Sequence, residues 1–233
     1  YTTLFRSGNR LGYLVAKTLI EQGSYVVIID KFNSSTKKYI SELKKSELVD
    51  FFDYKGFDSL FKNIKRFDYL FYFLNEKLKE PEFDSKEFLS QTKYLEQALL
   101  STKKNNAKFT LITSLALNRE LANRIQTEKT ASPSPYSNVE LQKYCENLVA
   151  EFGDKTDTNL RIIRLGTLLG KGIDKIDVPI LDTMFRDAVS KPQITIYGEG
   201  LDIHNLINEE DAAYGLLKLT FSDSTKKEVI TLA

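Results

Sequence analysis

Short apolar segments alternate with longer amphipathic ones along most of the chain. The first four occupy residues 2–5, 11–22, 25–30 and 36–45. Short runs of β-branched and aromatic residues predict strands, whereas apolar residues spaced three and four apart predict helices. The chain is therefore expected to begin with a strand, a helix, a second strand and a second helix.

The same alternation continues to residue 166. Further strands are predicted at 48–52, 67–74, 108–114 and 160–166, and helices at 57–64, 85–104 and 138–152. Near-continuous hydrophobic strands that are separated by helices are typical of a parallel sheet covered on both faces. We therefore expect an α/β protein with a doubly wound, Rossmann-like parallel sheet over residues 1–170.

The pattern loosens after Gly170. One helix is predicted at 181–189, a strand at 194–197 and a helix at 210–220, and the chain ends in the strand-like run VITLA. We expect a small C-terminal lobe over residues 171–233. Because the sequence lacks an initiator Met and stops in a strand-like run, we also expect the natural protein to extend beyond both ends.

Composition excludes several classes of protein. The 233 residues are 42% hydrophobic, which suffices for one large domain with a buried core. The 33 basic and 32 acidic residues leave a net charge of +1, which provides no global field for nucleic acid or an anionic membrane. One Cys and one His are too few for the usual metal sites, and no apolar run reaches the roughly 18 residues of a membrane span. We expect a cytoplasmic protein without metal, nucleic acid or membrane partners.

The first strand-to-helix turn is where such sheets bind a phosphate. It reads FRSGNRLG and ends at Gly12. The dinucleotide pattern places glycines at Ser7 and Asn9 in its tight spacing, or at Arg6 and Asn9 in its wider spacing, and only Gly12 matches either one. We expect Ser7, Asn9 and Gly12 to contact NAD or NADP there, with binding weakened by the added side chains.

Three charged residues near this turn each allow two interpretations. Arg6 and Arg10 either attract a phosphate or are solvated loop cations. Asp30 ends the run VVIID, 18 positions after Gly12, where an acidic residue accepts hydrogen bonds from the ribose hydroxyls of NAD. Strands also often end in Asp because that residue favours turns.

These segments together resemble the extended short-chain dehydrogenase/reductase family, the NAD-dependent epimerase/dehydratase group that acts on nucleotide sugars. LGYLVAKTLIEQGSYVVIIDKF is similar to the family's first helix and second strand, and FFD, ending at Asp53, to its adenine-contacting turn. KFTLITS resembles the strand that carries the catalytic Ser or Thr. ITIYGEGLDIHNLINEEDAAYGLLKL resembles the later segment that leads to an acidic pair, here Glu210 and Asp211. The resemblance implies a nucleotide-sugar ligand.

The resemblance also implies a catalytic set of Ser or Thr, Tyr, and a Lys four residues after the Tyr. Ser114 and Tyr136 match the first two positions, but Glu140 stands at the lysine position. The lysine would lower the pKa of the phenol, whereas a carboxylate raises it. Lys143 lies one turn further along the predicted helix and is the candidate surrogate.

Other positions depart from the family in the same direction. His204 falls where the family has the arginine that binds the nucleotide sugar, and an imidazole grips a phosphate less well than a guanidinium. Leu115 and Ala116 replace the acidic pair of the dehydratases, which disfavours dehydration. Without catalysis, Ser114 would be a strand-end hydroxyl bonded to backbone, and Tyr136 would pack on the sheet.

The two longest predicted helices, 85–104 and 138–152, correspond to those that make dimers in the family. Each carries an apolar stripe: Phe88, Leu89, Leu95 and Leu99 in one, and Leu141, Tyr144, Cys145 and Leu148 in the other. We expect a homodimer through these helices, and the alternative is that the stripes only cover the sheet. Cys145 is expected to be a core residue.

The altered glycine turn, the missing lysine and the missing arginine favour a pseudoenzyme. Such a protein keeps the family's fold as a binding or scaffolding module. The alternative is an active NAD(P)-dependent nucleotide-sugar epimerase or reductase with an altered site. It would use Tyr136 and Ser114, with Lys143 as the surrogate, and would hold NAD through Asp30 and Asp53.

Overall fold

A computed structural model describes residues 1–32, 36–53, 66–74, 85–115, 137–171, 178–196, 198–201 and 203–233. The predicted helix over 57–64 lies outside these residues.

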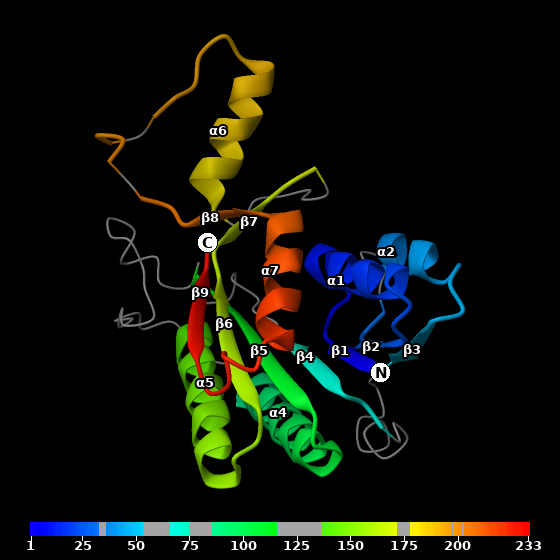
Figure 1. Ribbon diagram of the computed structural model, residues 1–233. Helices are drawn as coiled ribbons and strands as arrows, with labels where there is room; N and C mark the ends of the chain where they lie inside the picture. The colour runs from blue at the N-terminus through cyan, green and yellow to red at the C-terminus, as the bar shows by residue number, and fades with distance from the viewer. Residues whose placement is uncertain are drawn as a thin grey trace.

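The described strands form a parallel sheet of seven strands in the order β3-β2-β1-β4-β5-β6-β9 (Figure 1). Their bounds are β1 Thr2–Phe5, β2 Val26–Asp30, β3 Val49–Asp53, β4 Tyr69–Phe73, β5 Lys108–Ser114, β6 Leu160–Leu165 and β9 Val229–Leu232. The strand order reverses between β1 and β4. In doubly wound sheets the crevice at this reversal, outside the carboxyl ends of the strands, binds the ligand. The seven parallel strands and the reversal of their order confirm the doubly wound α/β fold predicted from the sequence.

Helices cover both faces of the sheet (Figure 1). On one face lie α1 Arg10–Glu21, α2 Lys37–Leu43 and α7 Glu209–Phe221, and on the other lie α4 Ser85–Asn105 and α5 Ser137–Thr156. Consecutive strand residues point to opposite faces. In β1, for example, Leu4 joins the apolar cluster under α1 and α7, whereas Phe5 joins the cluster under α4 and α5. Burial on both faces explains why these strands read as continuous apolar runs.

The C-terminal part of the chain divides between the main sheet and a projecting segment. β7 Thr167–Leu169 pairs in parallel with β8 Leu206–Asn208, and between them α6 Pro179–Ser190 extends away from the sheet (Figure 1). By contrast, α7 packs against α1, and β9 pairs with β6 as the last strand of the main sheet. Within the expected lobe over 171–233, α7 and β9 thus belong to the main body.

The strand predicted at 194–197 is wrong for its described residues. Residues 194–196 form no strand, and Ile194 and Ile196 are 46% and 60% exposed. An alternating apolar run forms a strand only where another strand pairs with it, and this run follows α6 in the projecting segment.

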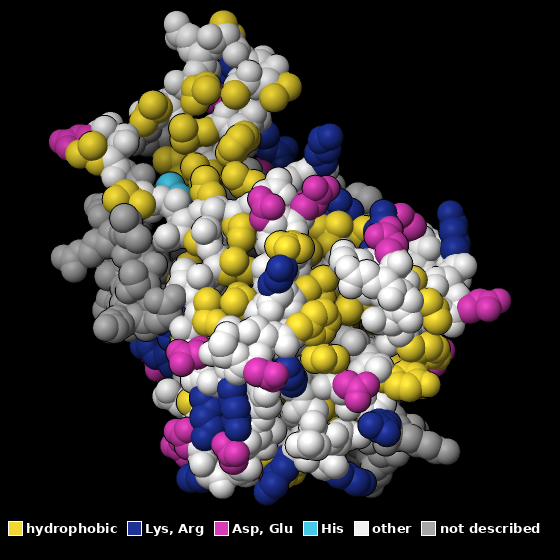
Figure 2. All heavy atoms as spheres, in the orientation of Figure 1, with side chains coloured by type: hydrophobic (Ala, Val, Ile, Leu, Met, Phe, Trp, Pro, Cys, Tyr) yellow, Lys and Arg dark blue, Asp and Glu magenta, His cyan; other side chains and the backbone are white. Residues whose placement is uncertain are grey.

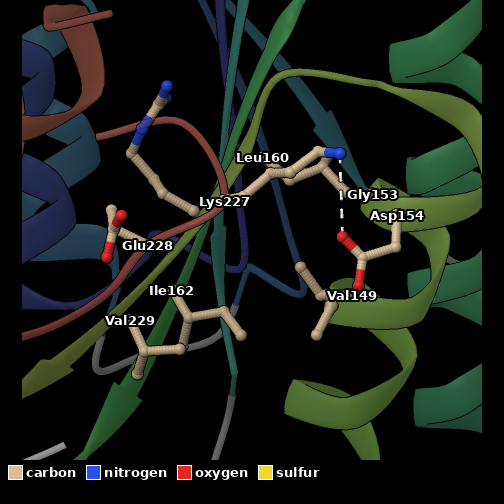
Figure 3. A pocket seen from close by; sticks show the side chains of 10 residues that line it. Val149, Gly153, Asp154, Leu160, Ile162, Lys227, Glu228 and Val229 are labelled. Carbon is tan, nitrogen blue, oxygen red and sulfur yellow. Dashed lines mark ion pairs between the residues drawn. The ribbon is translucent and has the colours of Figure 1, made fainter. Parts of the chain in front are cut away.

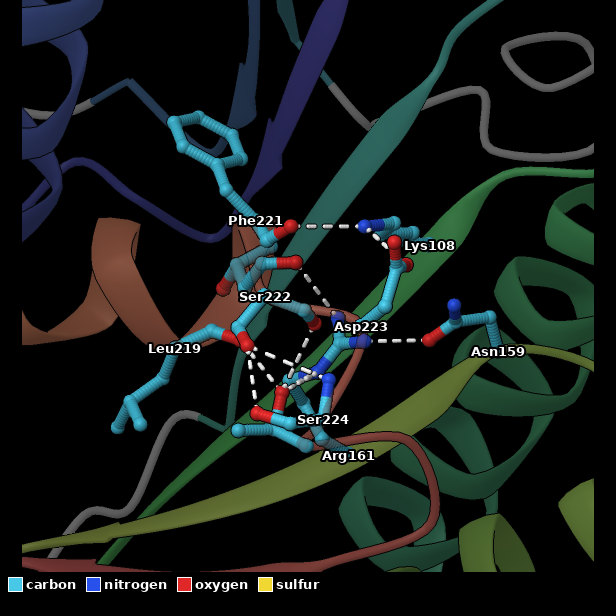
Figure 4. Close-up of polar contacts among 10 residues, drawn as sticks. Lys108, Asn159, Arg161, Leu219, Phe221, Ser222, Asp223 and Ser224 are labelled. Atoms are coloured by element: carbon cyan, nitrogen blue, oxygen red, sulfur yellow. Dashed lines mark hydrogen bonds and ion pairs between the residues drawn. The ribbon is translucent and has the colours of Figure 1, made fainter.

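Polar contacts fasten the end of α7 to the amino-terminal ends of two strands (Figure 4). Arg161 of β6 is buried, and its Nη1 donates to the carbonyl oxygen of Thr220 at 3.0 Å. Burial lowers the pKa of Arg161 to about 10, which still leaves it charged at neutral pH. Lys108 of β5 donates to the carbonyl oxygen of Phe221 at 2.8 Å and forms an ion pair with Asp223 at 2.7 Å. The opposite end of α7 is thereby held at the carboxyl edge of the sheet, beside α1.

Candidate functional site

Arg6 directly follows β1 and adopts the left-handed backbone conformation, with φ of 58°. This conformation favours glycine. The side chain is only 5% exposed, and its guanidinium carbon lies 5.6 Å from the ring centroid of Phe5 and 5.7 Å from that of Tyr94 on α4. The interpretation of Arg6 as a solvated loop cation is therefore wrong. Its side chain joins the end of β1 to the helix that follows β4.

Arg10, the first residue of α1, forms a two-pronged ion pair with Glu209 at the start of α7. Its Nε and Nη2 donate to the two carboxylate oxygens at 3.0 and 2.8 Å, and the Glu209 side chain is 2% exposed. The hydrogen bonds to Glu209 raise the pKa of Arg10. Arg10 is therefore not a solvated cation either. The sequence interpretation had singled out Glu210 and Asp211, which are both exposed, and it missed the buried Glu209.

The rest of the turn is closely packed. Asn9 caps α1, and its Oδ1 accepts a hydrogen bond from the Gly12 N–H at 2.8 Å. A Cβ added at Gly12 would lie 2.1 Å from the carbonyl oxygen of Ser7, so only glycine allows the helix to pack so closely. The hydroxyl of the buried Ser7 donates to the carbonyl oxygen of Leu4 at 3.4 Å. Gly12 thus has the helix-packing function of the last glycine in the dinucleotide pattern.

Asp30, at the end of β2, accepts two backbone hydrogen bonds. Its carboxylate oxygens receive the N–H groups of Gly8 at 2.5 Å and Lys31 at 2.6 Å. Burial raises the pKa of Asp30, although these donors and the positive charge of Arg6 oppose the rise. Its neighbour in register on β3 is the exposed Asp53, so the two predicted carboxylates lie side by side. A carboxylate accepts about four hydrogen bonds, so Asp30 has capacity left for ribose hydroxyls.

The turn therefore matches the dinucleotide-binding pattern only in part. Gly12 and Asp30 match the pattern. Arg6 and Asn9 instead carry side chains at the two places where the wider glycine spacing leaves the backbone bare for a pyrophosphate. The Asn9 side chain also already uses one N–H of the helix N-terminus.

Of the catalytic positions implied by the resemblance, the structure describes one on β5 and two on α5. Ser114 ends β5 and is half-buried, while Tyr136 lies outside the described residues. Glu140 does not face the sheet, because its side chain is 57% exposed and accepts a hydrogen bond of 2.8 Å from Lys143 Nζ. Lys143, the candidate surrogate, is thus engaged by the carboxylate that stands at the lysine position.

The inner face of α5 at this level carries Gln142 instead. Gln142 is 6% exposed, and its Nε2 donates to Glu146 Oε1 at 3.0 Å. Glu146 also accepts from Thr113 Oγ1 on β5 at 2.8 Å and forms an ion pair with Arg164 on β6 at 2.6 Å. Gln142 and Glu146, four residues apart, share a helix face. Glu140 and Gln142, two residues apart, point in nearly opposite directions.

Gln142 was not identified from the sequence, because the family's lysine position was located by its spacing of four residues from Tyr136. A sequence pattern could have indicated a buried polar pair here. The polar residues at positions 142 and 146 are four apart, on a helix side that also carries Val139 and Val149. All four of these side chains are buried. The Oε1 atom of Gln142 has no hydrogen-bond partner among the described residues.

His204 and the projecting segment belong to the C-terminal part of the chain. His204 is half-buried in the stretch that leads to β8, which pairs with the strand following β6. Apolar side chains gather on the projecting segment (Figure 2). Its exposed members include Phe185 at 51% and Val189 at 91% on α6, and Leu201 at 71% beyond it.

A small pocket lies at the opposite edge of the sheet, between α5, β6 and β9 (Figure 3). It has a volume of about 60 Å³ and is lined by Val149, Leu160 and Val229 among others, with Lys227 and Asp154 paired at 3.6 Å beside it. Ligand pockets for small molecules typically measure some 300–1,000 Å³. This pocket is therefore too small for a nucleotide and lies away from the carboxyl edge.

Two further findings concern metal ligands and membrane spans in the part of the chain that the structure describes. No group of three His, Cys, Asp or Glu side chains there is arranged to hold a metal ion. Nor does any helix in that part have the length and apolar character to cross a membrane. Cys145 is fully buried in the core under α4 and α5, as predicted.

Comparison with solved structures finds the same fold. UDP-glucuronic acid 4-epimerase from Bacillus cereus, in complex with UDP-glucuronic acid and NAD, is 18% identical with a TM-score of 0.78, over 100% of this chain and 77% of that one. UDP-N-acetylglucosamine 4-epimerase from Methanobrevibacter ruminantium, in complex with UDP-N-acetylmuramic acid, is 19% identical with a TM-score of 0.77, over 100% and 76%. dTDP-glucose 4,6-dehydratase from Bacillus anthracis, in complex with NAD, is 12% identical with a TM-score of 0.74, over 99% and 74%.

Comparison at the level of sequence identifies the family. No curated protein matches the chain. The model of the NAD dependent epimerase/dehydratase family matches residues 10–233, which is nearly the whole sequence. The chain therefore belongs to the NAD dependent epimerase/dehydratase family.

Proposed function

We propose that this family member has lost epimerase and dehydrogenase catalysis and serves as a binding or scaffolding module. The observation that carries the proposal is the inner face of α5. There the chain presents the neutral amide of Gln142, while Lys143 pairs with Glu140 nearer the surface. A tyrosine with an ordinary pKa of about 10 acts as a base near neutral pH only when a nearby cation stabilises its phenolate. Neither arrangement supplies that cation.

The first turn supports the same proposal. Arg6 and Asn9 do not fit a pyrophosphate that must approach bare backbone, although Asp30 fits a ribose. We infer that NAD and NADP bind weakly. The similar epimerase structures hold UDP-sugars, and we propose a nucleotide sugar as the ligand class of this chain. We propose His204 as one of its contacts, whereas Ser7 is buried beneath the turn. We also propose a cytoplasmic location for the protein.

The outer faces of α4 and α5 support a homodimer. Leu95, Leu99 and Leu141 are buried against the sheet, so covering the sheet accounts for that part of the stripes. Leu89 and Tyr144 are instead 65% and 47% exposed. We propose that a second copy of the chain covers these two side chains.

An activity assay tests the loss of catalysis. Purified protein is incubated overnight with millimolar NAD and, separately, UDP-glucose, UDP-glucuronic acid and UDP-N-acetylglucosamine, and products are followed by NMR. We expect no conversion above that of a Tyr136→Phe control. Conversion by the wild type that disappears in Tyr136→Phe and in Ser114→Ala would contradict the proposal and support the active epimerase.

The homodimer is tested separately by sedimentation velocity. We expect Leu89→Lys to sediment as a monomer, because it would bury a charge in the proposed interface. Val189→Lys, on the far-projecting α6, is the matched control and should leave the dimer intact. A monomeric wild type would rule the interface out.

A further inference from the structure

The crevice at the reversal of strand order lies between β1 and β4. In a doubly wound sheet, a dinucleotide enters this crevice with its pyrophosphate against the turn that follows the first strand. Residue 6 is the first residue of that turn. The direction of its side chain therefore decides how much of the crevice is open.

The Arg6 side chain does not continue the alternation of β1. Leu4 packs under α1 and Phe5 packs under α4, so alternation would direct residue 6 towards α1. The left-handed backbone at φ of 58° breaks this alternation. The guanidinium instead lies near the rings of Phe5 and Tyr94, on the side of α4.

The surrounding rings hold the guanidinium in this position. Cations within about 6 Å of aromatic centroids are attracted to the ring faces, and Arg6 meets this distance for two rings. The Phe5 ring lies 4.8 Å from the ring of Tyr72 on β4, whose hydroxyl donates to the carbonyl oxygen of Gln91 on α4 at 3.4 Å. The cluster thus connects β1, β4 and α4 around a side chain that is 5% exposed.

We propose that Arg6 excludes dinucleotides from this protein. Its guanidinium fills the space between the end of β1 and α4 that the pyrophosphate side of NAD or NADP has to enter. This inference deepens the proposed function and rests on it, because it assigns the weak cofactor binding to one residue. It also predicts that removing this side chain opens the crevice.

Calorimetric titration of the full chain with NAD and with NADP tests the assignment. The variants are Arg6→Gly, which suits the left-handed backbone and empties the space, and Arg6→Met, which removes the charge but keeps most of the volume. We expect Arg6→Gly to bind NAD at least about tenfold more tightly than the wild type, and Arg6→Met to stay within about twofold of it. Circular dichroism verifies folding, and Arg6→Ser is the second variant if Arg6→Gly does not fold.

Two results would overturn the assignment. One is equal affinity of the wild type and Arg6→Gly, whether both are weak or both are tight. The other is a gain in Arg6→Met as large as in Arg6→Gly, because the methionine fills the same space. The proposed function fails on a different result, which is turnover of a UDP-sugar by the wild type, so the two failures are distinguishable.

Discussion

Gln142 donates its side-chain amide to Glu146 across one turn of α5, at 3.0 Å. Glu146 is also bonded to Thr113 on β5 and paired with Arg164 on β6, and its side chain is 8% exposed. A hydrogen-bonded network therefore joins the inner face of α5 to the carboxyl ends of these strands. At its centre, the charge of the Glu146 carboxylate is neutralised by Arg164. This network fastens the helix to the sheet and presents no unengaged cation to a substrate.

Restoring a lysine at position 140 is expected not to restore catalysis. Glu140 is largely exposed, so Glu140→Lys places the ammonium in solvent and changes the free energy of unfolding by no more than about 0.5 kcal/mol. The measurement is NAD-dependent conversion of UDP-sugars by this variant. It is compared with Gln142→Lys, which introduces the same ammonium group on the inner face of α5. Turnover by Glu140→Lys alone would show that residue 140 reaches the substrate and that the altered glycine turn is tolerated.

The buried ion pair between Arg164 and Glu146 is expected to stabilise the fold strongly. Arg164→Leu leaves the Glu146 carboxylate buried without its cation, which costs about 3–5 kcal/mol. Urea unfolding measures the loss. Lys155→Ala is the control, because it removes an exposed pair with Glu151 that is worth about 0.5 kcal/mol or less. Equal effects of the two substitutions would contradict the importance assigned to the network.

Gly12 is expected to be irreplaceable for a steric reason. In Gly12→Ala the new Cβ would lie 2.1 Å from the backbone oxygen of Ser7, so α1 must shift at a cost of about 3 kcal/mol. The matched helical control is Gly153→Ala, whose Cβ would meet the Leu160 side chain, with its nearest atom, Cδ1, at 3.0 Å. That control should stay within about 1 kcal/mol of the wild type, because it also gains helix propensity. A Gly12→Ala variant of unchanged stability would mean that the helix is packed less closely.

Sequence patterns predicted the fold well because the main strands are buried on both faces. Strands β1 to β6 lie within one or two residues of the predicted runs. The three-residue strands β7 and β8 were not predicted, because such short elements leave no recognisable period. The strand expected from Ile194 failed because the alternation of apolar residues does not show whether a partner strand exists.

The site was only partly predictable. The loss of glycines is visible in the sequence, and so is the position of Asp30 and Asp53 where predicted strands end. The structure adds that these two strands are neighbours. The packing of Arg6 on Tyr94 depends on a contact between distant segments and on a left-handed backbone, which no local pattern reveals. The pairing of Arg10 with Glu209 was missed because it also joins two segments that are far apart in the sequence.

Asp30 is expected to make stability depend on pH. Burial raises its pKa above the ordinary 3.8 in the folded state. The folded protein therefore binds this proton more tightly than the unfolded chain, and the stabilisation present at lower pH is lost as pH rises through the raised pKa. Relative to Asp30→Asn, the wild type should thus lose free energy of unfolding as the pH rises from the ordinary pKa of 3.8 through the raised pKa of the folded state. Urea titrations of both proteins at a series of pH values from about 4 upwards measure the difference. A difference independent of pH would contradict the raised pKa.

The central claim is that this chain keeps the fold of its family without the family's cofactor chemistry. Calorimetric titration of the wild-type protein with NAD and NADP tests it most directly. We expect both dinucleotides to bind only weakly, with dissociation constants of about a millimolar, because Arg6 and Asn9 occupy the pyrophosphate side of the turn. A micromolar dissociation constant for NAD would contradict it, since the dinucleotide would then fit beside both side chains.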